Sequence, residues 1–435
     1  MKVIHIPYSF HPENFGGTEI YVKELAISLK KYNVTSIVLF PGKRNSIFYY
    51  KGIKVYEIEI PEKIINLNEL YGAGNKIFTQ NFFNVILKEK PDIIHIHSYT
   101  RAISSELVKN LKKQNIKLIF TYHTPTVGCL NGTLLFMGRK MCLGNIRTEK
   151  CSFCFLYGLL SRYFKFPIFV VPLIQFYSFI FPFTLKGKVS TALSIYSLTN
   201  FYIKKFKEFL NYFDKIVVQC KWSVRFLISN NIDSKKLFYL EQGIKRSEIK
   251  NNKSERNNSL IKFGMFGRLH PVKGFDIVLK GMKKIKNQNF IVDIFGIYED
   301  SNYLRKIQKI IEDDKRFKLK KNIPNEKIYK ILKEYDAIII PSQLLETGPL
   351  ILLECMNAKV PVIGSNLGGI AERIKNTENG IIVDNPFSPV SWQETIERVL
   401  NEKELLKKIK ENIKSPYYID FNSKKIYELY NKVLI

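Results

Sequence analysis

Short runs of β-branched and other apolar residues alternate along this chain with segments in which apolar residues recur every three or four positions. Runs of the first kind are typical of buried strands, and segments of the second kind are typical of amphipathic helices. In the first half, helices are predicted over Gly17–Lys31, Asn75–Lys88 and Ser104–Lys113. Strands are predicted there over Lys2–Tyr8, Thr35–Phe40, Ile53–Ile58, Ile93–His97, Lys117–Tyr122, Lys215–Cys220 and Leu237–Leu240. In the second half, strands with a helical pattern behind each are predicted over Ile261–Arg268, Phe290–Phe295, Phe317–Lys320, Ala337–Pro341, Pro361–Ser365 and Gly380–Val383.

This alternation, with strands that are apolar almost throughout, indicates parallel sheets covered by helices on both faces. A polar run over residues 245–259 has too little apolar content to pack and predicts a linker. We therefore expect two doubly wound, Rossmann-like α/β domains, over residues 1–244 and 260–415, that face each other across a ligand cleft. Residues 416–435 are expected to hold a terminal helix that packs back on the first domain. Within that domain the alternation stops at about residues 125–212, which predicts an insertion with little regular structure.

The composition is that of a globular chain with more than one domain. The chain has 435 residues, of which 46% are hydrophobic and 25% charged, and this excludes a disordered or fibrous protein. Its six cysteines are too few for the disulfide framework of a small secreted scaffold. The first residues, MKVIHIPYSF, predict a strand and not a signal peptide, so we expect a reduced, cytoplasmic setting.

The formal net charge is +29, and part of this excess is local. Between Leu107 and Lys207 the chain has fifteen Lys and Arg and one acidic residue, Glu149. A general bias toward lysine codons would spread the excess evenly and explains this asymmetry poorly. An anionic partner, either nucleic acid or an acidic membrane surface, explains it better.

The most informative segment begins at Pro341 and runs PSQLLETGPLILLECMNAKVPVIGSNLGGIAE. Glu346 precedes a helix predicted to begin near Pro349, and Glu354 lies inside that helix, eight residues after Glu346. Carboxylates so placed can accept hydrogen bonds from sugar hydroxyls, and the free amides of the first helical turn can hold an oxyanion. The plainer alternative is a Glu346 that caps the helix and a solvated Glu354.

A second segment, FGMFGRLHPVKGFD, combines a strand end with two cations. Arg268 ends the strand, Lys273 follows five residues later, and Gly274 opens a helix. Two cations and a helix N-terminus at one sheet edge suit a diphosphate, although a surface Arg and Lys beside a loop would give the same pattern.

Two weaker features lie at strand ends in the first domain. Gly16 and Gly17 follow the first strand and would let the backbone approach a ligand closely, as in any tight turn of this kind. His123, in TYHTP, lies at the carboxyl end of a strand, which is the rim where open sheets bind ligands. A single histidine there can equally be structural.

In this order, the Gly-Gly loop, the strand-end histidine, the Arg-x4-Lys pair and Glu-x7-Glu followed by Gly-Gly resemble the family 4 glycosyltransferases of the GT-B fold. The resemblance covers nearly the whole chain. It implies that Arg268 and Lys273 neutralise the diphosphate of a UDP- or GDP-sugar, and that Glu354 holds the ribose hydroxyls. It implies catalytic roles for His123, Glu346, Arg268 and Lys273. The donor contacts that it implies come from Gly16, Gly17, Arg268, Lys273, Glu346, Thr347, Gly348, Pro349, Leu350 and Glu354.

The likeness further implies transfer with retention of anomeric configuration and without a cofactor. Departure of a nucleoside diphosphate builds negative charge, and preorganised Arg, Lys and amide dipoles stabilise that charge more than they stabilise the ground state. Two positions depart from the family pattern. Thr347-Gly348-Pro349 stands where Gly-Phe-Gly is usual after Glu346, which leaves the sugar preference open, and Thr124 stands where Asp often follows the strand-end histidine.

The insertion contains Cys129, Cys142, Cys151 and Cys154. Four thiolates with one Cys-x2-Cys pair suit tetrahedral zinc better than an iron–sulfur cluster, and four unpaired thiols in an irregular loop would be the alternative. The resemblance favours a metal, because some members of the family carry a related Cys-containing insertion. Cys220 and Cys355 are expected to be buried apolar residues.

The insertion also contains Phe166–Leu185, a run of twenty residues without a charge. Three prolines and its aromatic density argue against a regular membrane span and favour an interfacial segment. Cations flank this run: Arg162, Lys165, Lys186, Lys188, Lys204, Lys205 and Lys207. We therefore expect Tyr157–Lys207 to contact an anionic membrane surface, at the inner face of the cell membrane, where the acceptor would be a lipid-linked or other cell-surface glycan precursor. The alternative is that these apolar residues pack inside the first domain.

Three function classes remain to be distinguished. The leading hypothesis is a glycosyltransferase. A sugar-nucleotide epimerase of the same fold would transfer nothing to an acceptor. A non-enzymatic nucleic-acid-binding protein would explain the charge, but no binding module is present and the basic stretch is interleaved with apolar runs, so we expect no nucleic-acid partner.

Overall fold

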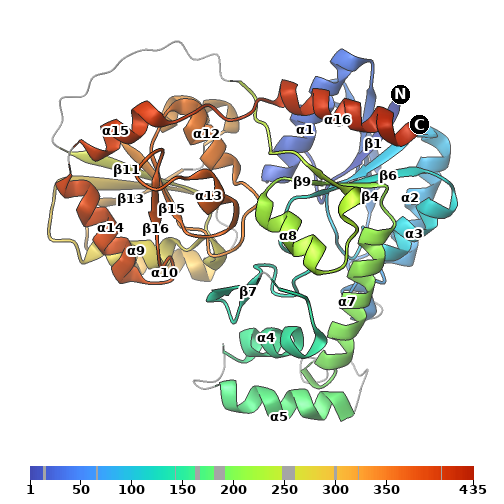
Figure 1. Ribbon diagram of the computed structural model, residues 1–435, viewed down its shortest axis with the longest axis horizontal. Coiled ribbons are helices and arrows are strands. Elements are labelled where there is room, and N and C mark those ends of the chain that lie inside the picture. The colour runs from blue at the N-terminus through green and yellow to red at the C-terminus, as the bar shows by residue number, and fades with distance from the viewer. Residues whose placement is uncertain are drawn as a thin grey trace. The chain divides into compact units, whose positions relative to one another are not determined.

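The computed structural model describes residues 1–12, 16–64, 67–142, 144–161, 167–180, 192–246, 260–297, 301–321, 323–402 and 404–435. They form two compact units (Figure 1). Unit 1 consists of Met1–Gln242 together with Ile419–Ile435, and unit 2 consists of Gly243–Tyr418. Most of the predicted linker lies outside the described residues.

Unit 1 is built on one large sheet. Its strands are β1 (Lys2–Ile6), β2 (Thr35–Gly42), β3 (Ser46–Tyr50), β4 (Ile53–Glu59), β5 (Ile93–Ile96), β6 (Lys117–Tyr122), β9 (Lys215–Val218) and β10 (Leu237–Tyr239). They lie in the order β10-β9-β6-β5-β1-β2-β4-β3. Every neighbouring pair is parallel except β3 with β4 at one edge. The predicted parallel sheet is therefore confirmed, and β3 is a strand that the sequence pattern missed.

Helices cover this sheet on both faces. They are α1 (Gly17–Leu29), α2 (Lys76–Glu89), α3 (Ser105–Lys113), α7 (Ile195–Asn211), α8 (Lys221–Ser229) and α16 (Ile419–Leu434), with short 3-10 turns η1 (Lys30–Tyr32), η2 (Leu67–Glu69) and η3 (Ser234–Lys236). The C-terminal helix α16 packs on α1, where the hydroxyls of Ser28 and Ser423 are 2.8 Å apart. Its Tyr430 is fully buried and lies 2.7 Å from a ring nitrogen of His95 on β5.

The insertion is more regular than its sequence suggested. It contains helices α4 (Thr148–Leu160) and α5 (Pro167–Ile180) and a hairpin of β7 (Leu135–Phe136) and β8 (Lys140–Met141). Figure 1 shows α4 and α5 side by side at the far end of α7. Leu156, Val171 and Ile195, one from each helix, are fully buried against one another and form a small separate core. The expectation of little regular structure was therefore wrong for the described part, because apolar residues on nearly every position of α5 obscured the helical period.

Unit 2 has a six-stranded sheet that is parallel throughout. Its strands are β11 (Ile261–Arg268), β12 (Phe290–Ile297), β13 (Phe317–Lys320), β14 (Ala337–Ile340), β15 (Val362–Ser365) and β16 (Ile381–Val383), in the order β13-β12-β11-β14-β15-β16. Its helices are α9 (Phe275–Lys283), α10 (Ser301–Ile311), α11 (Ile328–Leu332), α12 (Leu350–Ala358), α13 (Gly368–Arg373), α14 (Pro389–Asn401) and α15 (Leu405–Asn412), with short turns η4 (Pro271–Lys273) and η5 (Asn325–Lys327).

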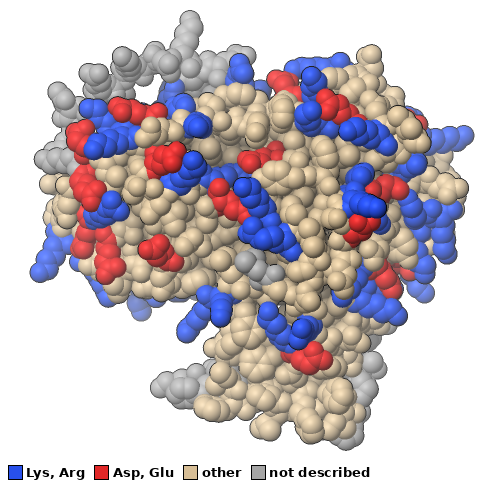
Figure 2. Space-filling model, viewed as in Figure 1, with Lys and Arg blue, Asp and Glu red and all other residues tan. Residues whose placement is uncertain are grey.

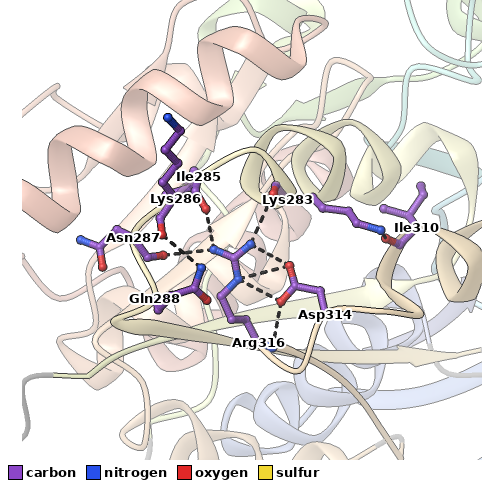
Figure 3. Close-up of polar contacts among 8 residues, drawn as sticks. All are labelled: Lys283, Ile285, Lys286, Asn287, Gln288, Ile310, Asp314 and Arg316. Atoms are coloured by element: carbon purple, nitrogen blue, oxygen red, sulfur yellow. Dashed lines mark hydrogen bonds and ion pairs between the residues drawn. The ribbon is translucent and has the colours of Figure 1, made fainter.

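One arginine fixes the turn between α9 and β12 (Figure 3). The buried guanidinium of Arg316 donates to both carboxylate oxygens of Asp314, at 2.9 and 2.7 Å. It also donates to three backbone carbonyls, those of Lys283, Ile285 and Asn287, at 3.3, 2.7 and 3.1 Å. Lys283 is the last residue of α9, and Ile285 and Asn287 follow it, so no further helical amide is available to these carbonyls. The Arg316 guanidinium thus binds the carbonyls at and after the C-terminus of α9 and fixes the course of the chain between α9 and β12.

Candidate functional site

The central strands of unit 2 bring two loops to the same sheet edge. Because β11 and β14 pair in parallel, the loops that follow them leave the sheet side by side. The amide of Gln343 donates to the carbonyl of Val272 over 2.7 Å, which joins the two loops. Gly274 has a φ of 69°, and a Cβ there would lie 2.3 Å from the carbonyl oxygen of Pro341. Glycine is therefore required at this position for the loops to approach.

This approach brings together two of the predicted site residues. Lys273 Nζ lies 2.5 Å from Glu346 Oε1, and Ser342 donates to the same oxygen over 3.0 Å. Both charged side chains are mostly shielded from solvent, with 21% of Lys273 and 15% of Glu346 exposed. Arg268, the other predicted cation, is exposed at the end of β11. The site therefore presents a lysine and a carboxylate as a hydrogen-bonded pair.

The backbone after Glu346 is held by the start of α13. The amide of Gly369 donates to the carbonyl of Glu346 over 2.6 Å. A Cβ on Gly368, whose φ is 52°, would lie 2.8 Å from that carbonyl oxygen. Arg373 donates to the carbonyl of Thr347 over 3.2 Å. Because Gly368 and Gly369 have no side chains, the start of α13 can pack directly against the backbone of the loop that contains Glu346 and hydrogen-bond to it.

Arg373 is a contributor to this loop that the sequence analysis did not single out. Its guanidinium lies 3.0 Å from where a Cβ on Gly348 would be, and Gly348 has a φ of 142°. Only the position of Arg373 four residues beyond the Gly-Gly pair, on the same short helix, could have pointed to it. Pro349 then caps α12, which begins at Leu350.

Glu354 lies in α12 and is buried, with 7% of its surface exposed. Burial alone raises the pKa of this carboxyl from 4.5 to about 7, and no hydrogen bond or ion pair to another described residue offsets that cost. A buried carboxyl group in this condition is more typical of a binding site than of a structural position. The predicted alternative of a solvated Glu354 was wrong.

In unit 1 the predicted residues lie at two neighbouring places. Gly16 precedes the first turn of α1, which begins at Gly17, and a Cβ on Gly16 would lie 2.4 Å from a carboxylate oxygen of Glu19. His123 directly follows β6 and is buried, and the ring of Tyr21 from α1 packs against it at 5.2 Å between centroids. Burial lowers the pKa of His123 to about 3, so its imidazole is neutral at physiological pH.

His123 is one of five buried histidines, and the other four were not identified as site residues from the sequence. His5 on β1, His95 on β5 and His97 just after β5 are all buried in the sheet. Burial lowers the pKa of His95 and His97 well below 6.5, and that of His5 to about 3. Each of these histidines lies in or next to an apolar strand segment, and nothing in that local sequence marks it as part of a site. The rings come together only because of the register between three neighbouring strands.

The four cysteines of the insertion gather near the β7–β8 hairpin. Cys142 follows β8, Cys151 and Cys154 lie on α4, and all six cysteines of the chain are free. Burial, with a smaller contribution from the other three thiols, raises the pKa of Cys151 to about 12. The Cys154 sulfur accepts a hydrogen bond from the amide of Met137 over 3.2 Å, and Cys129 lies among backbone amides of the loop that follows it.

These sulfurs are close enough to influence one another, but they do not form a compact ligand group. In the described part of the chain, only His5, His95 and His97 have ligating atoms that all lie within 4.8 Å of one another. Cys220 and Cys355 are fully buried, which confirms their predicted apolar role.

Two family models match this chain. Residues 246–415 match the group 1 glycosyl transferases, and residues 15–142 match Glycosyltransferase Family 4. A curated relative is the UDP-Gal:alpha-D-GlcNAc-diphosphoundecaprenol alpha-1,3-galactosyltransferase of Escherichia coli, 27% identical over 187 residues, which are 40% of this chain and 46% of that protein. The chain spans between 39% and 53% of the length of the first curated relatives that it matches.

Solved structures share the fold over nearly the whole chain. Sucrose-phosphate synthase of Thermosynechococcus elongatus has a TM-score of 0.69 at 14% identity, with 99% of this chain and 98% of that chain covered. HepE of Anabaena, solved in complex with UDP-glucose, has a TM-score of 0.63 at 12% identity, with 99% and 100% covered. Matched by family models in both of its units and sharing this fold, the chain belongs to the family 4 glycosyltransferases of the GT-B fold.

Proposed function

We propose that this protein transfers a sugar, with retention of anomeric configuration, from a UDP- or GDP-sugar to a lipid-linked glycan acceptor at an anionic membrane surface. The donor part of this proposal rests on the Lys273–Glu346 pair. Gly274 allows the two loops that hold these residues to approach each other, and the start of α13 holds the loop of Glu346 in place. The relatives support the substrate classes: the E. coli enzyme acts on a UDP-sugar and a diphosphoundecaprenol-linked acceptor, and HepE binds UDP-glucose.

The pair provides both charges that the donor needs. A diphosphate recruits cations: Arg268 ends β11, and Lys273 ends the short turn η4 that follows it. Lys273 has three N–H donors, so it can hold Glu346 and a phosphate oxygen at the same time. Glu346 is then oriented toward sugar hydroxyls by its bonds to Lys273 and Ser342. When the bond from the anomeric carbon to the diphosphate breaks, the lysine is already in place to stabilise the charge on the leaving group.

Glu354 completes the donor site in this proposal. An ionised, buried carboxylate without a protein partner gains most from paired hydroxyl donors such as those of a ribose. The unfavourable burial of Glu354 in the free protein is thereby offset when donor is bound. No metal ion is needed for the diphosphate, because Arg268 and Lys273 supply the positive charge.

The acceptor half of the proposal rests on the outer face of α5. Apolar side chains cover this face and are largely exposed: Ile168, Phe169, Leu173, Phe176, Tyr177, Phe179 and Ile180. Phe169 is 75% and Leu173 71% exposed, so these residues do not pack in the core of unit 1. Val171 and Ser178, on the opposite face, are fully buried. Figure 2 shows that the end of the molecule formed by α5 has no charged side chains on the face in view.

A membrane fits this face better than a soluble partner of mixed polarity does. Aromatic and aliphatic side chains on one face of a helix are the apolar signal of an interfacial helix, and the cations around the insertion supply the electrostatic signal. Among the described residues no helix is both long and apolar enough to cross a bilayer. The flanking Arg162, Lys165, Lys186 and Lys188 lie outside the described residues.

The direct test of the function is transfer of labelled sugar. Wild-type protein, given UDP- and GDP-sugars with a diphosphate-lipid-linked sugar acceptor, is expected to label the acceptor and release nucleoside diphosphate. Lys273→Ala is expected to slow transfer at least about tenfold and to weaken donor binding, because it removes a charge-assisted contact worth roughly 1.5–3 kcal/mol. Conversion of the donor sugar without acceptor labelling would indicate an epimerase instead, and wild-type kinetics in Lys273→Ala would exclude the donor site described above.

Glu354→Gln should change donor affinity and folding stability in opposite directions. In the free protein the pKa of Glu354 is raised to about 7, so the folded state holds a proton that the unfolded state releases above pH 4.5. The stability of the wild type should therefore fall as the pH rises from 4.5 to 7, and Glu354→Gln should be more stable than the wild type at pH 8 by up to about 3 kcal/mol. Donor affinity of the wild type should rise over the same pH interval and that of the variant should stay low. Calorimetry of both proteins measures this, with the exposed Glu394→Gln as control.

Membrane contact through α5 is tested by co-sedimentation with vesicles. The wild type should bind vesicles rich in anionic phospholipid and bind neutral ones less. Phe169→Glu/Leu173→Glu should lose binding to both, because charges on this face oppose insertion. Leu87→Glu on α2, where the leucine is 62% exposed, is the matched control and should bind as the wild type does. Unchanged binding by the double variant would show that α5 is not the contact.

For the four cysteines of the insertion we propose a structural zinc site, whose formation would draw their sulfurs closer together than they lie in this structure. Purified protein should contain about one equivalent of zinc per chain, and Cys151→Ser/Cys154→Ser should contain none. Since both thiols lie on α4, which packs on α5, loss of the metal should also weaken vesicle binding. Cys220→Ala serves as the control that retains the metal. Iron in place of zinc would indicate a cluster, and the absence of any metal after expression with zinc would refute the site.

A further inference from the structure

Three of the buried histidines form a row across neighbouring strands. The strands β6, β5 and β1 are adjacent in the sheet. His123 directly follows β6, His97 directly follows β5, and His5 lies on β1. His97 Nδ1 lies 3.1 Å from His123 Nε2, and His97 Nε2 lies 3.3 Å from His5 Nδ1. His97 therefore uses both of its ring nitrogens, one toward each neighbour.

A row of neutral imidazoles has only two consistent arrangements of protons. Each ring carries one N–H, and each contact needs one donor and one acceptor. If His5 donates from Nδ1 to His97, then His97 donates from Nδ1 to His123, whose proton must also be on Nδ1. In the reverse arrangement all three rings carry the proton on Nε2. The three rings must therefore share one tautomer.

The unused nitrogen of His5 favours one of the two arrangements. His5 Nε2 is buried and has no hydrogen-bond partner among the residues that the structure describes. With the protons on Nε2, this atom would be a buried N–H donor without an acceptor. With the protons on Nδ1, it is a bare lone pair, which folded proteins tolerate better than an unpaired N–H. The Nδ1–H arrangement is therefore favoured along the row.

His95 lies beside this row but is not part of it. Its two ring nitrogens are each 2.7 Å from a hydroxyl, those of Tyr430 and Thr121. A metal held by His5, His95 and His97 would have to break these bonds and the row at once, with no carboxylate to balance its charge. The hydrogen-bonded arrangement therefore accounts for this cluster better than a metal site does.

We propose that His97, backed by His5, is a positioning residue that fixes the tautomer and ring orientation of His123. In this proposal His97 acts only through its contact with His123. It keeps Nε2 of His123 occupied as an acceptor, so that the proton of His123 stays on Nδ1; His123 also has a side-chain hydrogen bond with Gln219. This inference rests on the proposed glycosyl transfer for its kinetic readout, but its spectroscopic readout is independent of activity.

The first measurement is the tautomer itself, by NMR of ¹⁵N-histidine-labelled protein. In the wild type, His5, His97 and His123 should all carry the proton on Nδ1. His97→Phe fills the same space but offers no hydrogen bond, and it should give His123 a mixture of tautomers. His97→Asn keeps one amide near the former Nδ1 and should restore the Nδ1–H form of His123. Different tautomers along the wild-type row, or a metal bound to these rings, would overturn the proposal.

Kinetics then separates positioning from mere packing. His97→Phe should lower kcat about 10- to 100-fold with little change in the KM for the donor, which is the size of effect seen when a partner that orients an imidazole is lost. His97→Asn should recover part of kcat. His95→Asn removes an equally buried histidine that does not contact His123 and should leave kcat unchanged in the folded protein. If His95→Asn and His97→Asn lose kcat equally, or if His97→Phe keeps both kcat and the wild-type tautomer, His97 has only a packing role. If the wild type transfers no sugar, the NMR result still decides the tautomer assignment.

Discussion

The parallel pairing of β11 with β14 is the constraint on which the donor site depends. It sends two loops out of the same sheet edge, and they can approach because Gly274 has no Cβ to meet the carbonyl of Pro341. Lys273 and Glu346, separated by 73 positions along the chain, are thereby placed 2.5 Å apart. The Gly-Gly pair at the start of α13 then holds the far side of the second loop. Backbone geometry fixed by glycines, more than side-chain packing, thus assembles the site.

The sequence predicted the sheets well because their strands carry strong, uninterrupted apolar runs. The bounds of β6, β11 and β13 agree with the prediction at both ends. The edge strand β3 was missed because one of its faces is exposed and its residues alternate weakly. In unit 2, the motif residues lie where a strand-to-loop-to-helix pattern places them, and the buried state of Glu354 could not be known before the packing of α12.

The helices of the insertion and the row of buried histidines could not be predicted from the sequence, for two different physical reasons. In α5 apolar residues occupy both faces, so no polar stripe marks which side is buried. The row depends on registry between strands that are distant in sequence: His5 lies opposite His95, and His97 continues from the end of β5 toward His123. No local sequence pattern indicates which residues of two distant strands will lie side by side. A single histidine at a strand end gave the only visible sign of a larger buried network.

The path of the chain between its units has a topological meaning. The chain leaves unit 1 after Gln242 and returns to it at Ile419. The two connecting segments are bonded to each other, with the amide of Ile244 donating to the carbonyl of Tyr417 over 3.1 Å, and Asn422 donates to the carbonyl of Glu241 over 2.6 Å. Unit 2 is therefore inserted into unit 1 through two connecting segments that are hydrogen-bonded to each other. Because Ile419–Ile435 belongs to unit 1, unit 1 is complete only after the whole of unit 2 has been synthesised.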